Sequence, residues 1–297
     1  MAAVVCFGLG YSARHWAAEF GQPFDRIVGT LRSPERAAAS AAARLGTTAV
    51  ETMVFDGVTA SPQLRARLDE ASVVLISAPP GAAGDPVLAA FGGTLPARRL
   101  ELAIYLSTVG VYGDHAGGIV DETTAPQPAS ARSKSRLAAE QAWQRFGADA
   151  GVPVAVLRLA GIYGPGQNAL VTLQEDRARR IVKPGQMFNR IHVADIGQAI
   201  AAAIARKAHG VVNVADDEPS PPQDVIAYAA RLLGIEPPPE IPFAEAAKAM
   251  SPMALSFYDE NKRVRNDKLK AELGVQLRYP TYREGLQALR AAMRNDL

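Results

Sequence analysis

The stretch AAVVCFGLGYSA (residues 2–13) decides the fold of this chain. An apolar run of strand type passes directly into a glycine turn of the form G-x-G-x-x-A. In such a turn the first glycine allows a tight bend, the second lets the backbone approach a pyrophosphate, and the alanine lets the next helix pack closely on the strand. The start of that helix favours negative charge. We therefore predict a dinucleotide-binding turn made by Gly8, Gly10, Tyr11, Ser12 and Ala13.

The end of the next apolar segment indicates which dinucleotide is bound. This segment, Arg26 to Thr30, closes the first βαβ unit within about 30 residues, as a dinucleotide fold requires. NAD-binding proteins usually carry an Asp or Glu about 20 residues past the glycines, where it holds the ribose 2′-hydroxyl. Here a hydroxyl at Thr30 and a guanidinium at Arg32 would instead accept a 2′-phosphate. We expect NADP(H) rather than NAD(H), the alternative being that Arg32 is a solvated residue at a helix start.

The composition is that of an ordinary globular protein. Of 297 residues, 48% are hydrophobic and 21% charged, with a formal net charge of +2, which argues against a disordered or nucleic-acid-coating chain. Cys6 is the only cysteine, which excludes disulfides within the chain, and the four histidines lack metal-ligand spacing, so no metal is expected. No run approaches the ~18 apolar residues of a membrane span. We expect a cytoplasmic protein with neither membrane nor nucleic-acid partners.

Alternating strand and helix patterns predict an α/β fold: a Rossmann-type doubly wound parallel sheet with a smaller, mostly helical C-terminal lobe. Asp56 ends one predicted strand, where it either lies beside the adenine or caps a turn with Gly57. Ala78 and Pro79 end another and should lie over the coenzyme crevice. We expect residues 1–165 plus about 190–215 to form the NADP-binding domain, and about 166–189 plus 216–297 the substrate lobe. Strands are expected at 50–55, 72–78, 102–106, 154–159 and 210–214, and helices at 34–45, 132–146 and 223–233.

Five motifs carry a resemblance to a known family. They are GLGYSA (8–13), STVGVYGD (107–114), RLAGIYGPG (158–166), RIHVADIGQAI (190–200) and VVNVADDEP (211–219). With them the chain resembles, over nearly its full length, the extended short-chain dehydrogenase/reductase superfamily, which contains the sugar-nucleotide epimerases and dehydratases. The resemblance implies an NAD(P)-dependent epimerase, dehydratase or reductase whose substrate is a sugar nucleotide or a related anionic small molecule. It also implies a homodimer formed through the helix at 132–146.

The family's catalytic Ser/Thr, Tyr and Lys are only partly present. Thr108 matches the hydroxyl, but the pattern S-P-Y-G-x-S-K-x-x-x-E-Q falls without a gap on residues 130–141, which places Arg132 at the Tyr position and Arg136 at the Lys position. A guanidinium stays protonated at neutral pH and cannot exchange a proton, although Arg136 could still bind the ribose hydroxyls. The chain thus resembles an atypical subgroup with Arg at both positions. Two functions stay open: an NADP-dependent enzyme, or a non-catalytic NADP(H)-binding sensor or regulatory protein.

Further polar residues allow two interpretations. A basic cluster after the YGPG segment suits either an anionic substrate or a solvated helix face; its members are Arg177, Arg179, Arg180 and Lys183. His192 is expected to be a hydrogen-bonded structural residue. Residues 216–218 are expected to form a solvated acidic turn, and Tyr112 and Tyr163, which follow predicted strands, could reach the cleft.

Overall fold

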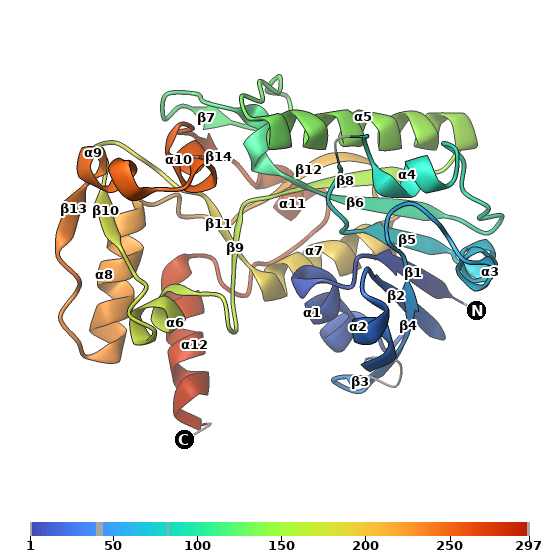
Figure 1. The fold of residues 1–297 in the computed structure, drawn as a ribbon, viewed down its shortest axis with the longest axis horizontal. Helices are drawn as coiled ribbons and strands as arrows, with labels where there is room; N and C mark the ends of the chain where they lie inside the picture. The colour runs from blue at the N-terminus through green and yellow to red at the C-terminus, as the bar shows by residue number, and fades with distance from the viewer. Residues whose placement is uncertain (1, 40–43, 82, 296–297) are drawn as a thin grey trace.

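The computed structural model describes residues 2–39, 44–81 and 83–295, which form a large sheet covered by helices and a smaller lobe (Figure 1). The strands of the main sheet are β1 (Ala3–Phe7), β2 (Arg26–Leu31), β3 (Arg44–Leu45), β4 (Thr48–Val54), β5 (Val73–Ile76), β6 (Leu102–Thr108), β8 (Val154–Leu159) and β12 (Gly210–Val214). Their order is β12-β8-β6-β5-β1-β2-β4-β3. Neighbouring strands run parallel except at β3, which is antiparallel to β4. The predicted doubly wound parallel sheet is confirmed.

The direction of winding reverses between β1 and β5. From β1 the chain builds outward through β2 and β4, and then returns to the other side of β1 with β5, β6, β8 and β12. Ligands of doubly wound sheets bind at the carboxyl ends of the strands beside such a reversal. The Gly8 turn leaves β1 at this point, and Ala78, just beyond β5, donates its backbone N–H to Phe7 O at 2.9 Å. The topology therefore brings two predicted coenzyme segments together.

Helices cover both faces of the sheet. One face packs against α1 (Tyr11–Phe20), α7 (Val193–Arg206) and α11 (Asp267–Ala271), and the other against α3 (Pro62–Glu70), α4 (Pro86–Ala90) and α5 (Ala131–Ala150). Helices α1 and α7 approach closely because Gly197 has no side chain; a Cβ there would lie 2.9 Å from the Phe20 ring. Strands buried on both faces are expected to be continuously apolar. β1 and β5 obey this, whereas β8 carries the buried Arg158.

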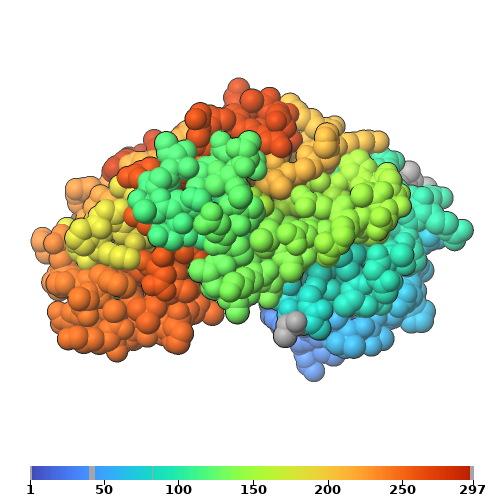
Figure 2. Space-filling view, turned by 90° about the horizontal axis from the view of Figure 1, so that it is seen from above, coloured from blue at the N-terminus to red at the C-terminus, as the bar shows by residue number. Residues whose placement is uncertain are grey.

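The smaller lobe has an apolar core of its own. It contains α6 (Ala169–Gln174), α8 (Pro222–Leu233) and α12 (Tyr282–Asn295), packed around Tyr163, Leu170, Val225, Ala229, Tyr282, Leu286 and Leu289. Two short sheets accompany it, one of β9 (Gly161–Tyr163) with β11 (Arg190–His192) and one of β10 (Arg180–Val182) with β13 (Glu240–Pro242). Figure 2 shows the outline of the molecule notched between the orange C-terminal residues and the blue N-terminal ones.

The C-terminal chain does not stay in this lobe throughout. After α9 (Phe243–Ala246), η2 (Ala247–Ala249) and α10 (Pro252–Tyr258), the strand β14 (Arg263–Val264) pairs with β7 (Ile119–Val120). Leu269, Leu273 and Val275 then belong to the core beneath the main sheet, beside β12. The segment from 263 to 277 thus packs on the larger domain, although the sequence analysis assigned all of residues 216–297 to the smaller lobe. The reason is that its apolar side chains cover the sheet beside β12.

One predicted helix is shorter than expected. The alanine-rich stretch 34–45 forms α2 (Pro34–Ala39) only, residues 40–43 lie outside the described residues, and Arg44–Leu45 are strand β3. Gly46, at φ +58°, lets the chain turn back so that Leu45 pairs with Thr48. Residues 44–49 form this hairpin because a left-handed glycine conformation suits a tight turn.

Candidate coenzyme and ligand sites

The glycine turn is held from two sides. Gly8 has φ +90°, and a Cβ there would lie 2.9 Å from Ala78 N, so a larger residue would be both strained and in collision with the backbone. The N–H of Gly8 donates to Thr30 Oγ1 at 2.9 Å, and Leu9 N donates to Thr30 O at 2.8 Å. The turn after β1 is therefore anchored to the ends of both β2 and β5.

The space above Gly10 fits a phosphate group. Helix α1 begins directly after Gly10 and has no side-chain cap, which leaves the N–H groups of its first turn to an anion. A Cβ on Gly10 would have only Ser77 Oγ within reach, at 4.0 Å, so the backbone is open there. Ser12 and Ala13 are buried against the sheet. These residues match the requirements of a dinucleotide pyrophosphate.

The other predicted coenzyme residues stand around this turn. Thr30 is buried, and its hydroxyl oxygen accepts the Gly8 N–H, so it supports the turn itself. Arg32 is exposed immediately after β2. Asp56 Oδ1 accepts from Val58 N and Thr59 N at 2.8 and 2.9 Å, which is turn capping, one of the two roles that the sequence allows. These bonds hold the pKa of the Asp56 carboxyl below its usual range. Both of them use Oδ1.

Thr108, the hydroxyl expected from the resemblance, lies at the carboxyl end of the sheet. It ends β6 and caps η1 (Val109–Tyr112), with its Oγ1 accepting from Gly110 N at 3.1 Å. A Cβ on Gly110 would lie 3.2 Å from Ser133 Oγ and 3.4 Å from Thr108 Oγ1. Two hydroxyls thus flank Gly110 at the carboxyl end of a sheet strand.

Arg132 and Arg136, which the resemblance assigns to the Tyr and Lys positions, do not form a hydrogen-bonded cluster with Thr108 among the described residues. Arg132 is exposed in the first turn of α5 and makes no hydrogen bond to the described residues. Arg136 is half-buried, and its Nη1 donates to Tyr105 Oη at 3.1 Å and to Leu106 O at 3.0 Å. Its guanidinium also lies over the Tyr105 ring, 5.5 Å from the centroid. Arg136 therefore ties α5 to β6.

A buried polar network lies beneath Thr108. Arg158 Nη2 and Glu140 Oε2 are 2.8 Å apart, and Ser107 donates its hydroxyl to Glu140 Oε1. The Arg158 guanidinium also lies 4.7 Å from the centroid of the Tyr112 ring. Tyr112 is fully buried and donates to Asn213 Oδ1 at 2.8 Å, so the expectation that it reaches the cleft is wrong. Burial raises the pKa of its phenol, which makes it a structural donor.

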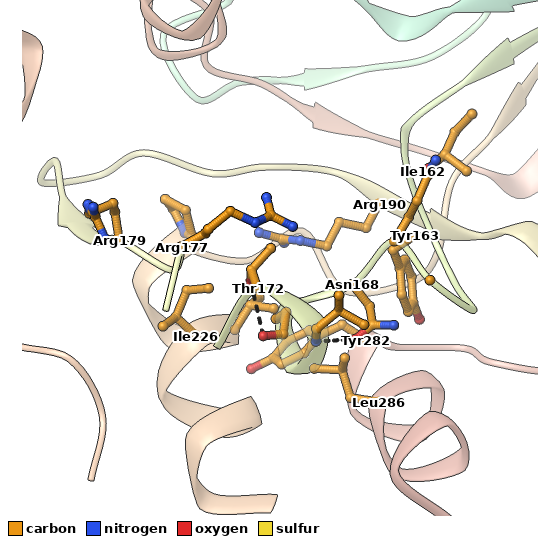
Figure 3. Close-up of a pocket in the computed structure, with 16 residues that line it drawn as sticks. Ile162, Tyr163, Asn168, Thr172, Arg177, Arg179, Arg190, Ile226, Tyr282 and Leu286 are labelled. Carbon is orange, nitrogen blue, oxygen red and sulfur yellow. Dashed lines mark hydrogen bonds between the residues drawn. The ribbon is translucent and has the colours of Figure 1, made fainter. Parts of the chain in front are cut away.

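A pocket of about 500 Å³ lies in the smaller lobe. Figure 3 shows Arg177 and Arg190 reaching into its middle from opposite sides, with Arg179 at its margin. Its walls come from β9, α6, α8 and α12: Ile162, Tyr163, Gly166, Gln167, Asn168, Ala169, Val171, Thr172, Pro222, Val225, Ile226, Tyr282 and Leu286. Arginines over an apolar and aromatic wall suit a ligand that has an anionic part and a flat or apolar part.

Arg190 is positioned in this pocket by hydrogen bonds and by an aromatic ring. Its Nη1 donates to Phe188 O at 3.1 Å and to Ser220 Oγ at 2.7 Å, and the guanidinium lies 5.9 Å from the centroid of the Tyr282 ring. Its hydrogen bonds to the described residues all run through Nη1, which leaves Nε and Nη2 as donors for a ligand. Arg177, by contrast, already pairs with Glu175.

Two titratable side chains, His192 and Asp216, are buried behind the pocket wall. The sequence predicts the first correctly and the second wrongly. His192 is buried and its Nδ1 accepts from Ala194 N at 3.1 Å, capping α7, which agrees with a structural role; burial lowers its pKa to about 4. Asp216 is not solvated as expected but only 2% exposed, because the chain passes beneath Arg190 and Asp216 N donates to Arg190 O. Burial raises its pKa to about 8.

Two residues of the pocket, Asn168 and Arg190, were not predicted from the sequence. Asn168 caps α6 through its Oδ1 and could have been recognised as a helix-start residue before an apolar run. Arg190 carries no local signal, because its importance comes from Ser220 and Tyr282, which are distant in the chain. Among residues 2–39, 44–81 and 83–295, no cluster of three or more His, Cys, Asp or Glu side chains could hold a metal ion, and no helix is long and apolar enough to cross a membrane.

Comparisons with known proteins agree with this architecture. Residues 93–215 match the model of the NAD dependent epimerase/dehydratase family. A 3-diazoavenalumate denitrifying reductase from a Streptomyces species is 30% identical over 137 residues, 44% of this chain and 45% of that protein. Protein YeeZ from Escherichia coli (strain K12) is 28% identical over 199 residues, 62% of this chain and 61% of that protein. The chain thus aligns with about half of the length of these curated relatives.

Solved structures match over the whole chain. A functionally unknown conserved protein from Silicibacter pomeroyi DSS is 47% identical, with a TM-score of 0.86 and 99% of both chains covered. UDP-glucuronic acid 4-epimerase from Bacillus cereus, solved in complex with NAD, is 17% identical, with a TM-score of 0.74 and 99% of both chains covered. At that identity the second likeness concerns the fold.

Proposed function

We propose that the chain, whose residues 93–215 match the NAD dependent epimerase/dehydratase family model, is a member of that family, binds NADP(H) at the Gly8–Ala13 turn and acts on an anionic small molecule, a sugar nucleotide or a related compound. The observation that carries this proposal is the pairing of an open glycine turn at the sheet's reversal point with a separate arginine-lined pocket. A bound nicotinamide dinucleotide supplies hydride transfer. The chain's own contribution is to hold the anion at Arg190 and to present the Thr108 hydroxyl at the end of β6.

NADP(H) is preferred in this proposal because Arg32, rather than a carboxylate, follows β2. Replacing Arg32 by Ser should weaken NADPH binding about 10- to 100-fold, the equivalent of one charge-assisted hydrogen bond of ~1.5–3 kcal/mol. NADH binding should change little, since it has no 2′-phosphate. The measurement is a fluorescence titration with both coenzymes.

The matched control for Arg32 is Arg99→Ser, because Arg99 is also exposed but lies before β6, at the amino ends of the strands. It should leave both affinities unchanged. Tighter binding of NADH than of NADPH by the parent protein would contradict the proposal that Arg32 selects NADP(H).

The pocket is proposed to hold the anionic part of the substrate. Titration with UDP and UDP-glucose should detect binding, and Arg190→Met should weaken it about 10- to 100-fold, because one or more charge-assisted hydrogen bonds of ~1.5–3 kcal/mol are lost. Arg190→Lys should recover only part of the affinity, since an ammonium lacks the planar donor fork. Arg145→Met, exposed on α5, is the control. Thermal unfolding of each variant separates lost binding from lost folding.

The second candidate, a non-catalytic NADP(H)-binding regulatory protein, is favoured by Arg132, which is exposed and cannot act as the proton-exchanging phenol of the family. A turnover screen of nucleotide sugars with NADPH and NADP⁺ separates the two. Turnover that Arg132→Ala abolishes would make Arg132 an electrostatic catalyst. No turnover in the parent, with activity gained by Arg132→Tyr plus Arg136→Lys, would favour the regulatory protein.

A further inference from the structure

A hydrogen bond joins the coenzyme turn to the wall of the ligand pocket. Tyr11 is the first residue of α1, directly after the glycines, and its phenol donates to Pro165 O at 2.8 Å. The two residues are 154 positions apart in the chain. Pro165 lies between β9 and α6, just before Gly166, Gln167 and Asn168, which line the pocket.

The Tyr11 side chain is held in place for this contact. Its ring packs edge-to-face against His15 on the next turn of α1, with centroids 4.7 Å apart. Its hydroxyl lies against Gly164, where a Cβ would come within 2.7 Å of the phenol oxygen and 2.6 Å of Val193. Burial raises the pKa of the phenol to about 12, so it remains a donor at neutral pH. Gly164 is therefore what lets Tyr11 reach the loop.

The contact continues into the pocket through Asn168. Asn168 Nδ2 donates to Gly164 O at 2.8 Å, and its Oδ1 accepts from Leu170 N and Val171 N at 2.9 and 3.2 Å. Gly164 and Gln167 also exchange backbone hydrogen bonds at 2.9 and 3.0 Å. The loop 164–168 and the first turn of α6 thus form one hydrogen-bonded unit, and Tyr11 is attached to its start.

We propose that Tyr11 is a coupling residue, whose phenol transmits occupancy between the coenzyme turn and the Arg190 pocket so that the two ligands raise each other's affinity. The inference rests on the proposed function for the two ligands. A dinucleotide held at Gly10 orders the start of α1, the Tyr11 phenol then orders the loop 164–168, and the pocket wall is preformed for an anion. Thermodynamic linkage requires the same factor in the opposite direction.

The test compares the parent protein with Tyr11→Phe, which removes the phenol oxygen and keeps the ring. The dissociation constant of UDP is measured without NADPH and with saturating NADPH. In the parent, NADPH should tighten UDP binding about 5-fold or more, the lower end of common coupling factors. In Tyr11→Phe this factor should fall to about 1–2, because the connecting hydrogen bond is absent. UDP binding without NADPH should weaken as well, because the free loop also loses the Tyr11 bond, so the coupling factor is taken within each protein as the ratio of its two dissociation constants.

The matched control is Tyr228→Phe, which also removes a hydrogen-bonded phenol, the acceptor of Gln287 Nε2 at 2.8 Å, from the smaller lobe. It should keep the parent's coupling factor. Equal coupling in Tyr11→Phe and in the parent would overturn the inference, and so would a parent factor of 1 with both ligands bound.

A second readout does not depend on the pocket ligand. Amide hydrogen exchange over residues 161–171 should be faster in free Tyr11→Phe than in the free parent, and NADPH should slow it in the parent only. Unchanged exchange in the free variant would overturn the inference even if no ligand bound. Failure of both NADPH and UDP to bind the parent would instead overturn the proposed function, so the two failures are distinguishable.

Discussion

Replacing Arg158 by methionine should lower the free energy of unfolding by about 3–5 kcal/mol, the usual cost of breaking a buried ion pair. Arg158 and Glu140 are 4% and 2% exposed. The guanidinium donates from Nε and Nη2 to the carboxylate at 2.8–3.2 Å. Without Arg158, Glu140 would be an uncompensated charge between α5 and the sheet. The measurement is urea unfolding of both proteins with the slope compared, so that a shifted midpoint reports stability.

A double variant tests whether the unpaired charge is the cause. Arg158→Met with Glu140→Gln should recover a large part of the loss, since a neutral amide can still accept from Ser107 and leaves no buried ion. Arg98→Met is the exposed control: this side chain is 86% exposed and pairs with Asp69, so its loss should cost less than about 1 kcal/mol. A single variant Arg158→Met as stable as the Arg98 control would contradict the prediction.

Replacing Asp216 by asparagine should stabilise the protein at pH 8 and change the pH dependence of its stability. Burial raises the pKa of Asp216 from 3.8 to about 8. Between these values the native state keeps a proton that the unfolded chain releases, so the parent's stability falls as pH rises and levels off above 8. Each pKa unit corresponds to about 1.4 kcal/mol, so Asp216→Asn should gain a few kcal/mol at pH 8 and lose this slope.

The pH range that reports the titration of Asp216 lies above the usual pKa of histidine. Burial lowers the pKa of His192 to about 4, so the unfolded chain takes up that proton first on acidification and stability falls as pH decreases from 6.5 toward 4. From pH 6.5 to 8 that contribution is flat, and the slope reports Asp216. Unfolding at several pH values across this window, with the exposed Asp224→Asn as control, measures it. A slope that survives in Asp216→Asn would contradict the assignment.

Residues whose role is local could be predicted from the sequence. The turn at Gly8 and Gly10 was predictable because a positive φ and a close backbone approach are requirements of single residues. The strands 154–159 and 210–214 were predicted to the residue, since runs of branched apolar side chains between turns indicate buried parallel strands. For Asp56 the sequence allows two roles, a place beside the adenine or a turn cap. The hydrogen bonds that it accepts from Val58 N and Thr59 N are those of a turn cap.

Residues whose role depends on distant partners could not be predicted in this way. Tyr112 faces inward, where Asn213 on β12, 101 residues later in the chain, supplies its acceptor. The acidic sequence around Asp216 predicts a solvated turn, whereas Asp216 is buried beneath Arg190. Local charge pattern gives no information on burial, because burial results from which other segments pack over a residue.

The sequence by itself determined the Rossmann-type sheet and the glycine turn after its first strand, because strand periodicity and glycine conformation are properties of short segments. Only the tertiary structure decided that Arg190 is the supported cation of a pocket and that Tyr11 touches the loop of that pocket. Both contacts join segments that are far apart in the chain. They exist because the sheet's reversal and the return through β9 and β11 bring those segments together.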